Sequence, residues 1–235
     1  MKILAIEASG LVASVALIEN DKLVAEYTIN NKLTHSQTIM PMIEEICNLT
    51  ELELSTIDYI ACSSGPGSFT GLRIGAATAK GLALGLNIPV IPVPTLDALA
   101  YNIFDTQCLI CPIMDARRQQ VYTAIYEWKE DDLCCISDPA ALPIDEIIQK
   151  AESFGRKIVF LGDGVPVYRK KLLEQENFVL APANCNMQKA SSVAALGQVI
   201  AKKGNWVKGD AFAPIYLRKS QAERELEEKN RHSTE

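Results

Sequence analysis

The expected strands and helices run twice through the same order, and this repeat constrains the fold more than any other feature of the chain. Apolar residues that alternate with polar ones predict strands, and apolar residues three and four positions apart predict helices. In the first half, strands are expected at 2–8, 11–19, 22–30, 59–63 and 90–93, with helices at 34–49, 70–86 and 95–104. In the second half, strands are expected at 109–114, 120–128, 133–136, 157–161 and 178–180, with helices at 143–154, 167–175 and 191–203. Each half has the order β-β-β-α-β-α-β-α, which indicates a duplicated domain.

Each half is expected to open with a three-stranded meander. Asn20 and Asp21 provide the tight turn between the second and third strands. Doubly wound nucleotide-binding folds alternate strand and helix from the start, so they are disfavoured. The order resembles the pair of ribonuclease-H-like domains in the actin, Hsp70 and sugar-kinase (ASKHA) superfamily. We therefore expect an α/β protein with an N-terminal domain at 1–105, a C-terminal domain at 106–218 and a polar tail at 219–235.

Composition and charge exclude several classes of protein. The net charge of −6 offers no electrostatic footprint for a nucleic-acid backbone, so a role in RNA chemistry would be indirect. The apolar run at 3–6 is only four residues long and is interrupted by Glu7, which argues against a signal peptide or a membrane span there. A cytoplasmic protein without a membrane partner is expected.

The seven cysteines favour reduced, buried thiols over a disulfide framework. Cys108 and Cys111 form a CxxC pair, but they stand in an apolar run that predicts a buried strand. No second CxxC and no neighbouring histidine completes a tetrahedral zinc site. The pair is therefore expected to be structural, and the same holds for Cys134 and Cys135.

A glycine-rich loop joins the fourth expected strand to the helix that follows it. Its sequence from Gly65 to Gly75 is GPGSFTGLRIG, and either Ser68 or Thr70 is expected to cap the helix. The free N–H groups of such a helix start can hold an anion. The loop has no lysine that reaches a phosphate, so tight packing of the helix after the strand is the favoured interpretation.

The helix at 70–86 has one nearly flat face. Gly71, Gly75 and Ala79 recur at every fourth position along it. A glycine inside a helix costs about 1 kcal/mol of stability relative to alanine, so a close neighbour must offset that cost. The neighbour is either this chain's own core or a partner protein, and the residues alone leave both open.

The run GPGSFTGLRIG and its continuation AATAKGLA resemble the hallmark of the TsaB family, also called YeaZ. The chain is similar to that family from residue 1 to about residue 224, with further matching stretches in the expected order. These stretches are 2–9, His35-Ser36 with Pro41, 115–118 with Val121-Tyr122, 162–164 and 214–218.

The resemblance implies a non-catalytic scaffold subunit that activates a tRNA-modifying complex. It implies a paralogue of the catalytic TsaD subunit, which it binds, together with the ATPase TsaE, in forming threonylcarbamoyladenosine at adenosine 37 of tRNA. It also implies that the two N-terminal helices form the dimer contact, with a homodimer as a weaker state and tRNA met only through the complex. The interface residues expected on those helices are His35, Ile39, Met42, Ile43, Ile46, Gly71, Leu72, Arg73, Gly75, Ala76, Ala79 and Lys80.

An ASKHA enzyme grips phosphate with an acidic residue that ends the first strand of each domain and with glycines beside it. Here the acids are Glu7 and Asp115, but Gly10 is displaced and Arg117 is bulky. The grip is therefore degenerate, and ATP or ADP is expected to bind only weakly or at a subunit boundary, with no cofactor required. The expected nucleotide or anion contacts are Glu7, Ser9, Gly65, Gly67, Asp115, Gly162 and Gly164. The end of a strand explains the turn at 162–164 equally well.

Metal and nucleophilic catalysis are disfavoured by the histidine count. The two histidines are His35 and His232, and a single ligand cannot hold a catalytic metal. No serine or cysteine has a clear base to activate it. Asp115 with Arg117 and Arg118 is either an anion site or a salt-bridged surface turn, and the turn is favoured. An autonomous ATP-dependent phosphotransferase or hydrolase is the main alternative function, whereas a metal-dependent peptidase conflicts with the histidine count.

Overall fold

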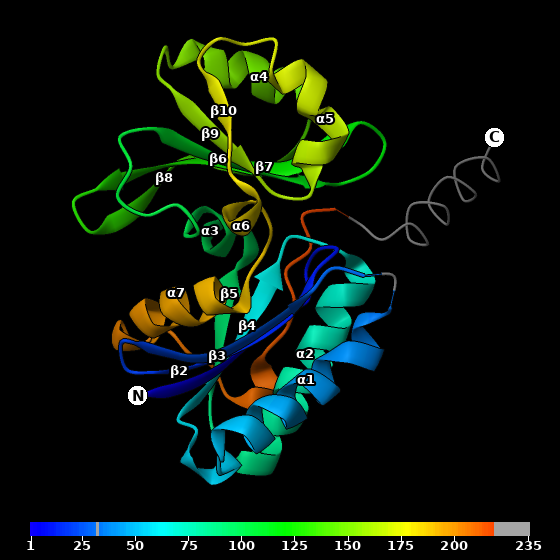
Figure 1. Cartoon of the computed structure of the whole chain (residues 1–235), viewed down its shortest axis with the longest axis vertical. Helices are drawn as coiled ribbons and strands as arrows, with labels where there is room; N and C mark the ends of the chain where they lie inside the picture. The colour runs from blue at the N-terminus through cyan, green and yellow to red at the C-terminus, as the bar shows by residue number, and fades with distance from the viewer. Residues whose placement is uncertain (32, 219–235) are drawn as a thin grey trace, which may run out of the picture.

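The computed structural model describes residues 1–31 and 33–218, which form two halves that each contain a five-stranded mixed sheet (Figure 1). The first sheet lies in the lower part of the view and the second in the upper part. The polar tail expected at 219–235, which includes His232, lies outside the described residues.

The first sheet combines an antiparallel meander with two parallel strands. Its strands are β1 (Lys2–Glu7), β2 (Ala13–Glu19), β3 (Lys22–Ile29), β4 (Tyr59–Gly65) and β5 (Val90–Pro94). Their order across the sheet is β3-β2-β1-β4-β5. The meander strands β1, β2 and β3 are antiparallel, whereas β4 and β5 run parallel to β1.

The second sheet repeats this arrangement. Its strands are β6 (Leu109–Asp115), β7 (Gln120–Lys129), β8 (Asp132–Pro143), β9 (Ile158–Leu161) and β10 (Phe178–Leu180). Their order is β10-β9-β6-β7-β8. Counted from the meander edge, both sheets therefore place their third, second, first, fourth and fifth strands side by side. This shared topology confirms the expected pair of ribonuclease-H-like domains of the ASKHA superfamily.

Helices cover both faces of the first sheet. α1 (His35–Thr50) and α2 (Phe69–Leu86) lie on one face, and α7 (Ala190–Lys202) lies on the other (Figure 1). α1 begins with the expected capping box, in which Thr34 and Gln37 satisfy each other's backbone N–H groups. Alternate side chains of β1 point to opposite faces, so one set packs with α1 and α2 and the other with α7.

Shorter helices complete the second half and the junction between the halves. α4 (Ile144–Ser153) and α5 (Gly164–Leu172) pack on one face of the second sheet. α3 (Thr95–Ala100) and α6 (Ala183–Asn186) lie between the two sheets (Figure 1). Two 3₁₀ turns, η1 (Leu54–Thr56) and η2 (Gly209–Ala211), were not expected from the sequence.

The last part of the described chain returns to the first sheet. Val193 of α7 is buried against it, and Val207 forms two backbone hydrogen bonds of 2.8 and 2.9 Å with β5. Phe212 is buried in the core that also contains α1 and α2. The C-terminal domain at 106–218 stays a prediction, but these contacts attach residues 190–212 to the first sheet.

Three elements differ from their expected ranges by three residues or more at one end or both. α3 ends at Ala100 instead of 104, α5 begins at Gly164 instead of 167, and β8 continues to Pro143 instead of ending at 136. β8 contains Pro139, and a proline is disfavoured inside a strand because it has no N–H to donate to a neighbouring strand. Because β8 is the edge strand and pairs only with β7, the missing N–H of a proline is tolerated there.

Candidate functional site

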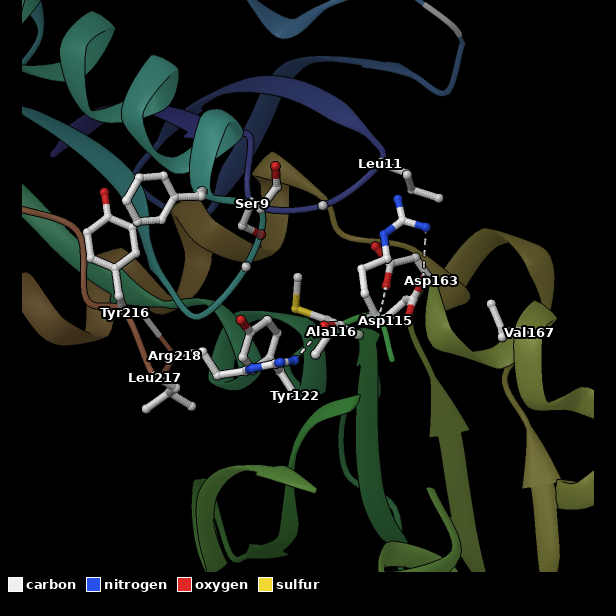
Figure 2. A pocket seen from close by; sticks show the side chains of 16 residues that line it. Ser9, Leu11, Asp115, Ala116, Tyr122, Asp163, Val167, Tyr216, Leu217 and Arg218 are labelled. Carbon is white, nitrogen blue, oxygen red and sulfur yellow. Dashed lines mark hydrogen bonds and ion pairs between the residues drawn. The ribbon is translucent and has the colours of Figure 1, made fainter. Parts of the chain in front are cut away.

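A cleft of about 430 Å³ lies between the two halves, at the carboxyl ends of β1, β4 and β6 (Figure 2). Open α/β sheets bind ligands at this end of their strands. The walls are the loop after β1, the start of α2, the loop after β6, the start of α5 and the C-terminal segment. The lining residues are Ser9, Gly10, Leu11, Gly67, Ser68, Phe69, Met114, Asp115, Ala116, Arg117, Tyr122, Asp163, Val167, Tyr216, Leu217 and Arg218.

Backbone atoms of other segments of this chain contact the glycine-rich loop closely. Gly65 has a φ of +114°, and a Cβ atom there would overlap the carbonyl oxygen of Ile215. The Ile215 N–H donates to a carbonyl oxygen at the end of β4 over 2.7 Å. A Cβ at Gly67 would overlap the Ser9 carbonyl oxygen, which accepts the Ser68 N–H over 2.6 Å. These two glycines therefore admit close contacts within the chain.

The start of α2 lies against the loop after β1. Ser68, and not Thr70, is the N-cap, and its hydroxyl accepts the Gly71 N–H over 3.3 Å. A Cβ at Gly71 would overlap the Ala8 carbonyl oxygen, and a Cβ at Gly75 would lie 3.2 Å from the Ala8 side chain. The flat face of α2 thus packs inside this chain, which accounts for its glycines without a partner.

Most of the expected interface residues are buried in the core of the first half. The buried ones are Ile39, Met42, Ile43, Ile46, Gly71, Leu72, Gly75, Ala76 and Ala79. Of the others, Arg73 is exposed, and His35 and Lys80 are half-buried. A partner that docks on α1 and α2 would therefore touch their outer faces, and such docking stays a prediction.

The outer faces of α1 and α2 carry exposed apolar and small residues. Met40 is 49% exposed and Leu84 is 60% exposed. Ala77, Gly81 and Gly85 are exposed as well, and a Cβ at either glycine would meet no atom of residues 1–31 or 33–218 within 4 Å. Sequence reasoning missed this set, because small residues occur all around α2 and their spacing does not show which side faces the sheet.

His35 ties the start of α1 to the loop after β1. Its Nε2 lies 2.9 Å from the Gly10 carbonyl oxygen, so this nitrogen carries a hydrogen and donates it. Among residues 1–31 and 33–218, no group of three or more histidine, cysteine or acidic side chains is arranged to hold a metal ion. The expected capping or interface role of His35 is consistent with this local contact.

Glu7 lies behind the wall of the cleft, at the end of β1. It is fully buried, and the Ser9 N–H and hydroxyl both donate to its Oε1, the N–H over 2.6 Å. Burial raises the pKa of Glu7 to about 7, and the hydrogen bonds from Ser9 oppose that rise. The carboxyl is thus held by its own loop and does not face the cleft.

Asp163, like Asp115, reaches the cleft from the second half, and it was not among the contacts expected from the sequence. It lies between Gly162 and Gly164, and its Oδ1 accepts the Asp115 N–H over 2.9 Å. Burial raises the pKa of Asp163, whereas backbone hydrogen bonds from Asp115 and Leu11 lower it. Gly162 has a φ of +110° and packs against the Ile113 carbonyl of β6, as a strand-end turn does.

The cleft brings together three of the seven expected anion contacts, namely Ser9, Gly67 and Asp115. Glu7, Gly65, Gly162 and Gly164 do not line it. Arg117 forms an ion pair of 3.3 Å with Asp115, which is the salt-bridged turn that the sequence favoured. Anion binding at any of these residues stays a prediction.

Comparisons with known proteins identify the family. The family described as TsaD, tRNA N6-adenosine threonylcarbamoyltransferase, matches residues 22–226. The tRNA threonylcarbamoyladenosine biosynthesis protein TsaB of Bacillus subtilis strain 168 is 34% identical to this chain, covering 95% of the chain and 96% of the relative. The chain belongs to the TsaB family.

Further members of the TsaB family are similar to this chain over nearly its whole length. TsaB of Escherichia coli strain K12 is 29% identical, covering 96% of this chain and 98% of the relative. The structure of YeaZ from Pseudomonas aeruginosa has a TM-score of 0.80 and 25% identity, covering 92% of this chain and 99% of that one. The TsaB resemblance expected from the GPGSFTGLRIG run is confirmed.

The stretch at 214–218, which helped to carry the TsaB resemblance, crosses the mouth of the cleft. The Tyr216 ring lies 4.4 Å from the Phe69 ring between centroids, and the Arg73 guanidinium lies 4.1 Å from the Phe69 centroid. Arg218 Nη1 donates to the Ala116 carbonyl over 2.7 Å (Figure 2). This stretch therefore links the start of α2 to the loop after β6, although more than a hundred residues separate the partners in each pair.

The remaining features of this TsaB-family chain concern its thiols and helices. All seven cysteines are unpaired thiols, and burial raises the pKa of Cys111 in β6 to about 12. Cys62 and Cys111 are buried as expected, but the expectation of buried thiols is wrong for the other five, because Cys135 is exposed and Cys47, Cys108, Cys134 and Cys185 are half-buried. Over the described ranges, no helix is both long enough and apolar enough to cross a bilayer.

Proposed function

We propose that this chain is a non-catalytic subunit that holds a TsaD-like catalytic subunit in its active arrangement while N6-threonylcarbamoyladenosine forms at position 37 of tRNA. The proposal rests mainly on the glycine-rich loop, because atoms of this chain occupy the space beside its glycines. In an ASKHA enzyme, glycines let backbone amides approach phosphate. Here Gly65 approaches Ile215 and Gly67 approaches Ser9, so the space beside both glycines is taken by this chain.

The cleft mouth supports the same proposal. Leu11 and Val167, which are 57% and 59% exposed, line it from opposite halves. Apolar side chains at these places give a phosphate no hydrogen bond. The buried Glu7 carboxyl is held by Ser9 and does not line the cleft. We expect ATP or ADP to bind the isolated chain weakly, or to bind at a subunit boundary.

The outer faces of α1 and α2 supply the docking surface for the partner. Gly81 and Gly85 each weaken α2 by about 1 kcal/mol relative to alanine, and no contact within the described chain offsets that loss. Close approach of a second helix would offset it, because glycine lets two helix backbones come together. Leu84 stands between the two glycines in the sequence and would be covered at the same time, and Met40 is an exposed apolar side chain on the outer face of α1.

The partner that fits is a helix pair like this one, as a TsaD-like paralogue would present. The same face would form a weaker homodimer when that partner is absent. A TsaE-like ATPase would join the assembled pair, and tRNA would be met through the complex, because a net charge of −6 does not attract a phosphate backbone.

Co-purification with the TsaD-like subunit of the same genome tests the docking surface. Gly81→Leu and Leu84→Glu should lose the partner, because one blocks close approach and the other places a charge in an apolar contact. The matched control is Leu173→Glu, since Leu173 is also an exposed leucine but lies after α5 on the second half. Circular dichroism should show all three variants folded.

Retention of the partner by both α2 variants would overturn the proposed docking surface.

Titration of the isolated chain with Mg-ATP tests the proposal that this chain is not catalytic. Tight binding with turnover would overturn the proposal in favour of an ATP-dependent phosphotransferase or hydrolase.

A further inference from the structure

The contact between the two halves is apolar at α3, which lies between the two sheets on the left of the view in Figure 1. Leu96 and Leu99 of α3 pack in one core with residues of β6 and β7, whereas Ala98 packs in the core shared by the first sheet and α7. Separating the halves here would expose apolar surface to water, and that cost grows with the area exposed. The junction at α3 is therefore the side on which the halves stay together.

Polar contacts join the halves at the cleft. At its mouth, Arg218 Nη1 donates to the Ala116 carbonyl over 2.7 Å. At its floor, the buried Asp163 carboxyl accepts the Asp115 N–H of the second half over 2.9 Å and also accepts the Leu11 N–H of the first half. Water can replace hydrogen bonds of this kind at a small net cost. The halves therefore separate more readily at the cleft than at α3.

Asp163 is placed to bind across the cleft and not to stabilise its own helix. It is the N-cap of α5, a position where aspartate normally accepts an N–H group of the first helical turn. Here the carboxyl accepts none from α5, a helix that the structure describes in full. The lost cap weakens the start of α5. The contact between the halves offsets that loss, because the same carboxyl holds N–H groups from both of them.

Gly10 allows the loop after β1 to approach this carboxyl closely. A Cβ atom at Gly10 would lie 3.0 Å from Asp163 Oδ2 and 2.5 Å from Gln188 Nε2. Gln188 is buried and stands between α6 and α7, where the chain returns to the first half. Because buried side chains are closely packed, a larger residue at Gly10 would push the loop away from Asp163. The close contact at the cleft floor therefore depends on a glycine at this position.

We propose that Asp163 is a latch that holds the cleft closed through its hydrogen bonds to both halves, and that the halves open about α3 when these bonds are lost. Opening also breaks the contact between Arg218 and Ala116, because the stretch at 214–218 is bound to the start of α2 and Ala116 belongs to the second half. The latch is a property of the chain alone. Its failure would leave the proposed docking of a TsaD-like partner on α1 and α2 unaffected.

A distance measured between the halves of the full-length chain tests the latch. Spin labels are placed at Glu44 on α1 and at Lys170 on α5, which are both exposed, by non-canonical amino acids that avoid the seven cysteines. Pulsed electron paramagnetic resonance should show mainly one short distance in the unaltered chain. Asp163→Ala should add a longer distance and raise the ratio of open to closed molecules about tenfold or more, because hydrogen bonds to a charged group are lost.

A second variant and two matched controls make the result specific. Gly10→Val should also add the longer distance, although it leaves Asp163 in place. Asp145→Ala removes another acid of the second half, whose ion pair with Lys171 stays within that half, and should keep the short distance. Gly81→Val adds the same bulk as Gly10→Val at a place with room for it and should keep the short distance too. If circular dichroism shows Asp163→Ala unfolded, Gly10→Val carries the test.

Three outcomes would overturn the proposal. One is an unchanged short distance in folded Asp163→Ala, which would show that other contacts hold the cleft closed. Another is an equal shift in Asp145→Ala and Gly81→Val, which would show a general loosening of the chain. The third is a longer distance that is already as populated in the unaltered chain as in Asp163→Ala, which would show that the halves are not latched.

Discussion

Two glycines of α2 should respond in opposite directions to the same substitution. Gly71 lies in the first turn of the helix, where a Cβ would overlap the Ala8 carbonyl oxygen. Backbone must move to admit it, and overpacking of this kind destabilises by roughly 1–3 kcal/mol. The helix-propensity gain of alanine is small so near the helix start. Gly71→Ala should therefore lower the free energy of unfolding by about 2 kcal/mol.

Gly81 lies in the second half of α2, and a Cβ there would meet no atom within 4 Å among the residues that the structure describes. Gly81→Ala therefore has only the gain in helix propensity, and the free energy of unfolding should rise by about 0.5–1 kcal/mol. The two variants should differ by about 3 kcal/mol, which corresponds to roughly 6–12 °C in Tm for a chain of this size.

Urea titration of the isolated chain, followed by circular dichroism, measures both changes. Met40→Ala on the outer face of α1 is a useful third variant, because it should change stability little in the absence of a partner. A neutral or stabilising Gly71→Ala would show that α2 does not pack closely on the loop after β1. The account of the flat helix face would then be refuted.

Two further predictions concern buried polar groups. Because the pKa of Glu7 is about 7 in the folded chain and 4.5 ordinarily, the folded chain keeps a proton that the unfolded chain releases between these values. The free energy of unfolding should therefore fall by about 3 kcal/mol as pH rises from about 4.5 to about 7, and Glu7→Gln should remove that fall in urea titrations at both ends of this range. The Tyr126 hydroxyl donates to Asp97 over 2.7 Å and joins β7 to α3, so Tyr126→Phe should lower the free energy of unfolding by about 1–2 kcal/mol. Tyr122→Phe on the same strand is the control, and an equal loss in both would contradict a specific role for the Asp97 bond.

The duplicated fold was predictable because it depends on local patterns. Strand alternation and helical spacing appear within short windows, and the capping box at Thr34 marks the start of α1 without any tertiary contact. β8 was predicted too short for a related reason. A proline normally ends a strand, and only the position at the sheet edge, which no local pattern shows, permits Pro139 inside it.

The candidate site was predicted less well because its contacts join distant segments. Arg218 meets Ala116, and Ile215 meets Gly65, across spans that no local pattern connects. The loop that begins at Gly65 was recognised as a family signature, but the sequence did not show that Ile215 is its close neighbour. The sequence did not indicate the left-handed backbone of Arg117 and Arg118. A left-handed residue is normally inferred from glycine or asparagine, and neither stands at these positions.

The orientation of α2 on the sheet was also not predictable from its sequence. Its sequence carries small residues on every side, so spacing alone left open whether Gly75 and Ala79 faced the core or a partner. Burial of both against the first sheet leaves Gly81 and Gly85 as the α2 glycines beside which a Cβ would meet no atom of the described residues. The expected partner surface is thereby moved to the opposite side of the same helix.

Threonylcarbamoyladenosine formation on tRNA, reconstituted with the TsaD-like subunit and the ATPase, tests the central claim most directly. Two variants of this chain are compared with the unaltered one. Asp115→Asn changes the cleft acid while keeping its shape, and Leu84→Glu changes the outer face of α2. A scaffold predicts full modification with Asp115→Asn and its loss with Leu84→Glu. Loss with Asp115→Asn and full modification with Leu84→Glu would contradict the account and place catalysis in this cleft.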